Sequence, residues 1–145
     1  MKSTGDPSID ALYKVPKGKV EFVDVPELGF LVIDGGGDPS GDAFHDAIQA
    51  LYSVSYGAHF VLKKTTGSAP RVMALEALWW VEGADAQATM ERIAAGAASM
   101  DESDRDQWHW RAMIMQLAPI DTAVIEQAII EAKAKKDIAS LSAVR

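Results

Sequence analysis

Residues Val72–Val81, with the sequence V-M-A-L-E-A-L-W-W-V, form an apolar run that contains a single carboxylate, Glu76. A short apolar run of this kind predicts a strand. Because successive side chains of a strand point to opposite faces, Glu76 shares a face with Trp80, whereas Trp79 points the other way. A lone carboxylate is costly to bury among apolar groups. We therefore predict that Glu76 is an acid placed in an aromatic-walled pocket, where it can accept or donate a proton.

A second pair of tryptophans lies in the predicted strand Arg105–Gln116, where Trp108 and Trp110 share one face and His109 lies on the other. If this strand pairs with the first, we expect the Trp108–Trp110 wall to stand beside the face that carries Glu76. Aromatic walls around a carboxylate bind flat, lipophilic and often cationic molecules. The alternative from composition alone is an ordinary aromatic core.

The rest of the chain predicts an α+β fold, an antiparallel sheet with helices on one face. The remaining elements are strand material over Lys19–Gly35 interrupted at Pro26, a helix from about Asp42 to Lys63 capped by Asp38 or Ser40, and a helix capped by Asp121 or Thr122 that ends near Lys135. We divide the chain into an extended or loosely attached N-terminal arm (1–18), one folded module (19–136) and a tail (137–145). One or two helical turns are expected within Met90–Ala95.

Tyr52 and Tyr56 are four residues apart in the first long helix, so both lie along one edge of it. Two roles remain open for this pair. The rings could pack at the seam between helix and sheet, or their hydroxyls could reach a ligand.

Composition excludes several classes of function. The net charge of −7 over 145 residues argues against a nucleic-acid-binding surface, and the absence of cysteine excludes disulfides and thiolate nucleophiles. The histidines lie too far apart for a local metal motif, and no phosphate-binding loop or G-x-S-x-G elbow is present, so we predict no metal and no cofactor. No apolar run approaches a membrane span and no signal peptide is apparent, which predicts a soluble cytoplasmic protein without membrane contact.

Four blocks, in order, resemble the GyrI-like small-molecule-binding family: V-E-F-V-D-V-P-E-L-G-F-L-V-I-D-G-G-G-D-P, A-L-Y-S-V-S-Y, L-E-A-L-W-W and W-H-W-R-A-M-I-M-Q. The resemblance covers about residues 18–135 and is strongest to a branch of stand-alone proteins that includes cyclopropanoid cyclopropyl hydrolases. It implies a pair of strand–helix–strand–strand modules with a ligand cleft between them, of which this chain has the first. The residues that match the family's motifs are Glu76, Tyr52 and Tyr56 as the catalytic candidates, and Trp79, Trp80, Trp108 and Trp110 as the ligand-binding candidates.

The sequence departs from the family in length, because the second module, with its H-x-G-P-Y-like segment and further acid, does not follow Arg145. Either this sequence is part of a longer chain, or two chains supply one module each. A single module would expose a tryptophan-bearing sheet face, which soluble monomers rarely tolerate, so we predict a twofold homodimer.

Two functions of different class fit these residues. The first is a binding protein for lipophilic, aromatic or cationic compounds, with Glu76 offsetting a positive charge. The resemblance implies an effector-binding domain of a drug-resistance system. The second is a hydrolase in which Glu76 activates a water that opens the cyclopropane of a DNA-alkylating natural product. The missing second module favours binding over catalysis.

Overall fold

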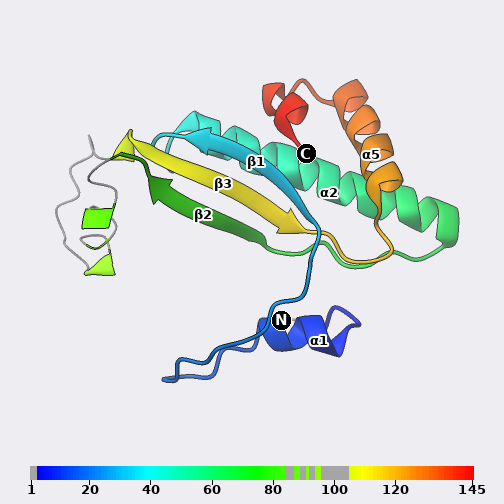
Figure 1. Ribbon diagram of the computed structural model, residues 1–145. Helices are drawn as coiled ribbons and strands as arrows, with labels where there is room; N and C mark the ends of the chain where they lie inside the picture. The colour runs from blue at the N-terminus through cyan, green and yellow to red at the C-terminus, as the bar shows by residue number, and fades with distance from the viewer. Residues whose placement is uncertain (1–2, 84–86, 89–90, 92–93, 96–104) are drawn as a thin grey trace.

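The protein is an α+β fold built on one three-stranded antiparallel sheet with the strand order β1-β3-β2 (Figure 1). The strands are β1 (Phe30–Gly36), β2 (Leu75–Val81) and β3 (Trp108–Met115). The computed structural model describes residues 3–83, 87–88, 91, 94–95 and 105–145. The predicted turns within Met90–Ala95 therefore lie largely outside the described residues.

The long helix α2 (Asp42–Thr66) packs along one face of the sheet, and α5 (Thr122–Lys135) packs against α2. The short helix α1 (Pro7–Leu12) lies apart from both, and a 3-10 helix, η1 (Ala139–Ala143), follows α5 (Figure 1). The described helices thus cover one face of the sheet and leave most of the other face open.

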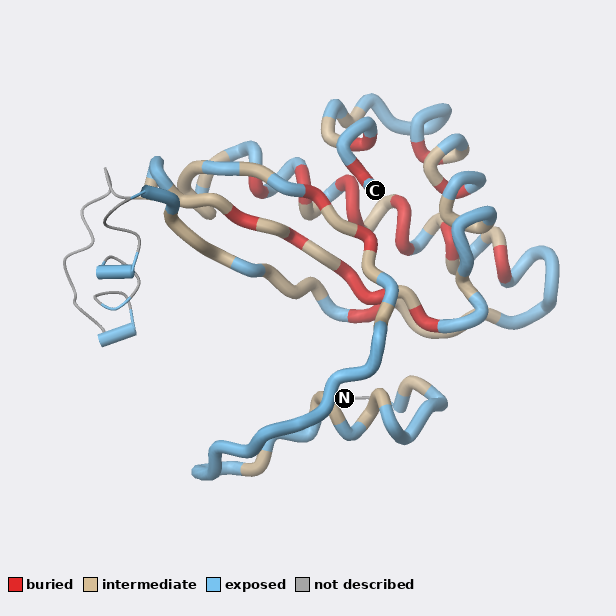
Figure 2. The backbone as a smooth tube through the Cα atoms, in the orientation of Figure 1, coloured by how far each residue is buried: buried red, intermediate tan, exposed pale blue. Residues whose placement is uncertain are grey.

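The core lies between α2 and the covered face of the sheet. Buried positions alternate along β3 and recur at helical spacing along α2, as the two repeats of strand and helix require (Figure 2). The fully or nearly fully buried side chains of these two elements include Trp110, Ala112 and Ile114 from β3 and Ala47, Leu51, Val54 and Ala58 from α2. This face of the sheet carries most of the burial that stabilises the fold.

Position 35 must be glycine because the indole of Trp110, the largest side chain of this core, lies directly against it. A Cβ atom added to Gly35 would lie 2.2 Å from Cζ2 of Trp110, the partner of Gly35 in the register of β1 and β3. The indole of Trp110 therefore fills the space that a side chain at Gly35 would need. Of the three consecutive glycines, only Gly37 has a positive φ (96°), and it lies just after the strand.

The predicted fold class and element order are confirmed. The helix predicted to end at Lys63 continues to Thr66 and stops at Gly67, which adopts the left-handed conformation typical of a helix C-terminus. Asp121 caps α5 through a hydrogen bond that its side chain accepts from the Val124 N–H.

Three local predictions are corrected. The strand predicted over Lys19–Gly35 is shorter in the structure, where β1 covers Phe30–Gly36. The segment that contains Val20 and Phe22 pairs with no strand among the described residues, and these two residues are 98% and 105% exposed. The N-terminal arm contains α1, capped by Asp6. Neither Asp38 nor Ser40 caps α2; Asp38 instead accepts hydrogen bonds from Ser40, and Gly41 occupies the capping position.

The tail is an ordered part of the fold. Leu141 and Val144 are buried in the core, and Arg145 exchanges two backbone hydrogen bonds with Val32 on the outer edge of β1. The tail therefore anchors the chain after α5 to the sheet.

Candidate functional site

The face of the sheet that α2 does not cover brings together a carboxylate, an aromatic ring, a histidine and an arginine. The register of the three strands arranges this uncovered face in rows. From one end to the other, in the order β1, β3, β2, the rows are Val32, Met113 and Glu76; then Asp34, Arg111 and Leu78; then Gly36, His109 and Trp80. Alternation along each strand places all of these side chains on the same face.

Glu76 is half-buried and is held by a tyrosine from the N-terminal arm. The hydroxyl of Tyr13, the residue that ends α1, donates a 2.6 Å hydrogen bond to Oε1 of Glu76. Burial of the Tyr13 ring, followed by this hydrogen bond and the negative charge of Glu76, raises the pKa of Tyr13 to about 12. Tyr13 therefore stays a neutral donor at physiological pH, and Glu76 is positioned as the acceptor.

Trp80 and His109 form a flat platform on the same face. Their rings stack with centroids 5.8 Å apart and an angle of 20° between the planes. Trp80 follows Glu76 by four residues along β2, a separation of about 13 Å in an extended strand. A flat molecule that lies over Leu78 can therefore contact the aromatic platform at one end and the carboxylate at the other.

Arg111 occupies the centre of the face in a fixed orientation. Its guanidinium donates two hydrogen bonds to the Asp34 carboxylate, at 2.6 and 2.9 Å, and Arg145 also pairs with this carboxylate. The hydrogen bond from Arg111 lowers the pKa of Asp34, and the positive charges of both arginines act in the same direction. The charge of Arg111 is thus largely balanced, which leaves Glu76 as the carboxylate of this face that no cation pairs with among the described residues.

The structure places three of the four predicted ligand-binding tryptophans on the opposite face. Trp79 pairs with Trp110 in the register of β2 and β3, and both point toward α2, as does Trp108. The ring centroids of Trp79 and Trp110 lie 4.9 and 5.1 Å from that of Phe44 in α2, and Trp79 lies 5.8 Å from Trp108. The expectation that a Trp108–Trp110 wall stands beside Glu76 is therefore wrong, because Glu76 pairs with Met113 and not with a residue of the tryptophan face.

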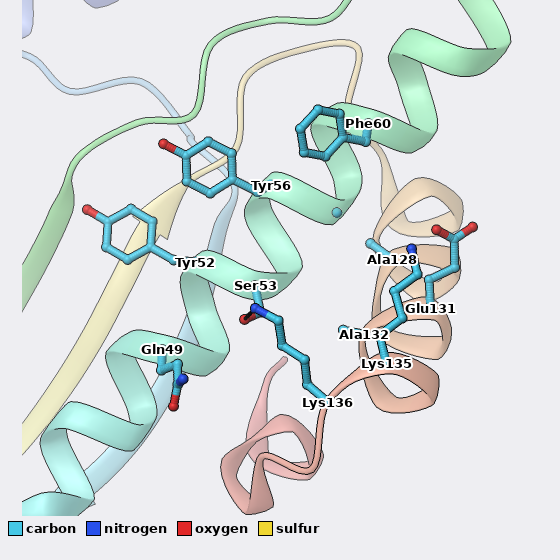
Figure 3. Close-up of a pocket in the computed structure, with 11 residues that line it drawn as sticks. Gln49, Tyr52, Ser53, Tyr56, Phe60, Ala128, Glu131, Ala132, Lys135 and Lys136 are labelled. Atoms are coloured by element: carbon cyan, nitrogen blue, oxygen red, sulfur yellow. Dashed lines mark hydrogen bonds between the residues drawn. The ribbon is translucent and has the colours of Figure 1, made fainter.

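Tyr52 and Tyr56 lie on α2 and do not reach the uncovered face. The Tyr52 hydroxyl accepts a 3.1 Å hydrogen bond from the backbone N–H of Leu75, at the start of the edge strand β2. The rings of Tyr52 and Tyr56 lie 6.2 Å apart, and Tyr56 is half exposed. Both tyrosines line a groove between α2 and α5 (Figure 3).

Tyr13, His109 and Arg111 belong to this face, although the sequence pattern did not predict a role for them. Alternation alone placed His109 and Arg111 on the face opposite to Trp108, but it did not show that Glu76 shares that face. Aligning the most apolar face of β2 with the most apolar face of β3 would have placed Glu76, His109 and Arg111 on one face. Pairing Trp79 with Trp110 then fixes the register of the two strands. No local pattern predicts the contact of Tyr13, which is 63 residues from Glu76 along the chain.

Comparison with solved structures gives similar proteins from Listeria innocua. An uncharacterized conserved protein is 31% identical with a TM-score of 0.73 over 95% of this chain and 62% of its own length. Two hydrolase structures are 28% and 30% identical, with TM-scores of 0.69 and 0.68, over 96% and 94% of this chain and 63% and 60% of their own length. This chain therefore spans about three fifths of the length of these proteins. No protein-family model and no curated protein matches the sequence.

Among the helices in the described part of the chain, none is long and apolar enough to cross a membrane.

Proposed function

We propose that this protein binds lipophilic, aromatic or cationic small molecules on the uncovered face of its sheet. The observation that carries the proposal is the half-buried carboxylate of Glu76, held by Tyr13 and placed on one face with the Trp80–His109 stack. A carboxylate beside an aromatic platform attracts a flat cation through charge and through the face of the ring. The four sequence blocks that resemble the GyrI-like small-molecule-binding family support membership in that family.

The residues have distinct roles in this proposal. Glu76 offsets the charge of the ligand, the Trp80–His109 stack holds its flat body, and Leu78 provides apolar contact between them. Trp79, Trp108 and Trp110 support the face from the core side. Trp79 and Trp110 pack against Phe44 there, and Trp108 packs against Trp79.

Binding is tested with a matched pair of probes, N-methylacridinium and uncharged acridine, which share a ring system and differ in charge. Titration followed by tryptophan fluorescence should give saturable quenching by N-methylacridinium and weaker binding of acridine. Glu76→Gln should remove the preference for the cation, whereas Glu27→Gln, an exposed site in the N-terminal region, should keep it. Equal binding of both probes by the wild-type protein would count against a role for Glu76.

Hydrolysis is a second candidate function, favoured by the two hydrolase structures that this chain resembles. In this candidate the Glu76 carboxylate takes a proton from a water, and the water oxygen attacks a carbon of an activated cyclopropane fused to a dienone. The ring C–C bond breaks, and its electron pair moves into the conjugated system to give a phenolate. The Tyr13 hydroxyl, which already donates to Glu76, is the tyrosine placed to supply a proton at this site.

Incubation with a cyclopropane-bearing alkylator tests the hydrolase directly. Mass spectrometry should detect a product heavier by one water, formed by the wild-type protein and not by Glu76→Gln. Saturable binding of the alkylator without such a product would leave binding as the function and exclude hydrolysis of that compound.

We further propose that two copies of the chain form a homodimer with the ligand cleft at their interface. Leu78, on the edge strand β2 of the uncovered face, is 52% exposed, and an exposed apolar side chain beside Trp80 favours association. Size-exclusion chromatography with light scattering should give twice the mass of one chain, and Leu78→Lys should shift the protein to the monomer. A wild-type monomer at micromolar concentration would contradict the dimer.

A further inference from the structure

A second surface of the molecule has the dimensions and chemistry of a ligand site. An open groove of about 520 Å³ is lined by residues of the helices α2 and α5 (Figure 3). This volume lies within the range of small-molecule sites, roughly 300–1,000 Å³. The groove is separated from the uncovered face by α2 and by the sheet, so it is independent of the site proposed around Glu76.

The α2 side of the groove is aromatic and accessible. Tyr52, Tyr56 and Phe60 lie on successive turns of α2 and line this groove (Figure 3), and Tyr56 and Phe60 are 52% and 60% exposed. The helices approach closely at the base, because a Cβ atom added to Gly57 would lie 3.3 Å from Cβ of Ala128. A flat molecule can pack against the exposed rings of Tyr56 and Phe60.

The α5 side of the groove is basic. Lys135 and Lys136 line it at the C-terminal end of α5, and Lys136 donates a 3.3 Å hydrogen bond to the hydroxyl of Ser53 across the groove. Neither lysine lies in an ion pair among the described residues. The one carboxylate of the lining, Glu131, accepts a hydrogen bond from Gln127 on its own helix.

Two unpaired cations beside exposed aromatic rings are unusual for a chain with a net charge of −7. A local positive potential on an acidic protein selects anions and repels cations. We infer that the groove between α2 and α5 binds a small aromatic organic acid, with its rings against Tyr56 and Phe60 and its acid group at Lys135 and Lys136. This preference is opposite in charge to that of the Glu76 site.

The inference is tested with 1-naphthoate and 1-naphthylmethylammonium, which carry opposite charges on the same bicyclic ring. Titration of the isotope-labelled protein by NMR should show saturable shifts of the Gly57 and Ala132 amide signals with 1-naphthoate. The ammonium probe should bind the groove at least about tenfold more weakly, because it loses the contact with the lysines. Glu76→Gln should leave naphthoate binding unchanged, so failure of the Glu76 proposal would not affect this result.

Matched variants separate the groove from other surfaces. Lys135→Gln combined with Lys136→Gln should weaken 1-naphthoate by roughly tenfold, whereas Lys133→Gln, in the same helical turn but outside the groove, should not. Tyr56→Ala should weaken it as well, and Phe22→Ala, which removes an exposed aromatic ring elsewhere, should have no effect.

The inference is overturned if 1-naphthoate shifts no groove signal, if it shifts only signals of the uncovered sheet face, or if the ammonium probe binds the groove equally well. Amide spectra of the free variants, compared with the wild type, confirm that each variant is folded.

Discussion

Both faces of the sheet carry tryptophan, but the tryptophans have different roles on the two faces. On the covered face, Trp79 and Trp110 pack with Phe44 beneath α2, and Trp108 packs against Trp79. On the uncovered face, Trp80 stacks on a histidine and shares the surface with Glu76. Neighbouring tryptophans in one strand, Trp79 and Trp80, therefore have different roles because the strand alternates. A tryptophan in an apolar strand therefore indicates a ligand-binding site only when the face of the sheet on which its side chain lies is known.

The largest expected effect separates these two tryptophan environments. Trp110→Ala should destabilise the protein by about 3–5 kcal/mol, because the indole is 2% exposed and its removal leaves a cavity beside Phe44. Trp80→Ala, the matched variant on the uncovered face, should cost less than about 1 kcal/mol. Chemical denaturation measures both.

Trp110→Phe sharpens this comparison, because the buried indole N–H of Trp110 has no hydrogen-bond partner among the described residues. The phenyl ring should retain most of the stability that alanine loses. Equal losses for Trp110→Ala and Trp80→Ala would show that the faces are not distinct.

Alanine substitutions of the two glycines of β1 also compare the covered and uncovered faces, with a smaller expected loss of stability. Gly35→Ala should cost about 1–3 kcal/mol, because the new methyl group meets the Trp110 ring at 2.2 Å. Gly36→Ala should cost less, since its Cβ atom points to the uncovered face and its nearest contact is the Trp108 carbonyl oxygen at 3.3 Å. Thermal unfolding of the two variants measures the difference, and an equal cost would contradict the packing described for Trp110.

Glu76→Gln should change binding and leave folding nearly unchanged. The variant keeps the shape of the side chain and a carbonyl oxygen for Tyr13, so the melting temperature should stay close to that of the wild type. Affinity for N-methylacridinium should fall about tenfold, the equivalent of roughly 1.4 kcal/mol, because the charge that attracts the cation is gone. A large loss of stability with unchanged affinity would make Glu76 a structural residue.

Tyr13→Phe should lower the stability of the fold by on the order of 1–2 kcal/mol, since it removes one hydrogen bond to a carboxylate. The contact also has a pH dependence. The pKa of Tyr13 is raised from 10.0 to about 12 in the folded protein, so the unfolded chain ionises first as the pH rises. The stability from this contact should be complete below about pH 10 and should be lost as the pH approaches 12.

Unfolding measured across this alkaline range should show a steeper decline for the wild type than for Tyr13→Phe. Tyr56→Phe is the matched control, because its hydroxyl lies on α2 away from Glu76. Parallel pH profiles for the wild type and Tyr13→Phe would show that Tyr13 does not hold Glu76 in solution.

The sequence predicts the fold well because the decisive patterns are local. The apolar repeat of α2, the capping by Asp121 and the alternation of β2 and β3 are each contained within a few turns or pleats. The uncovered face is harder to predict, since it depends on which face of β2 lies beside which face of β3. A register that pairs Glu76 with Met113 and Trp79 with Trp110 is a non-local fact that alternation alone leaves open.

The same limit applies to the N-terminal arm and the tail. Tyr13 reaches Glu76 and Arg145 reaches Val32 and Asp34 through contacts between distant parts of the chain, and neither segment has a periodic pattern. For Val20 and Phe22 the sequence predicts a strand that the structure does not contain, and both side chains are exposed. A β-prone sequence forms a strand only where the edge of a sheet is available to pair with it.

A crystal structure of the protein with N-methylacridinium tests the central claim most directly. The account predicts the acridinium ring stacked on Trp80 and His109, with its cationic nitrogen directed toward the carboxylate of Glu76. Ligand found only elsewhere, or a Glu76 carboxylate that makes no contact with the bound cation, would contradict it.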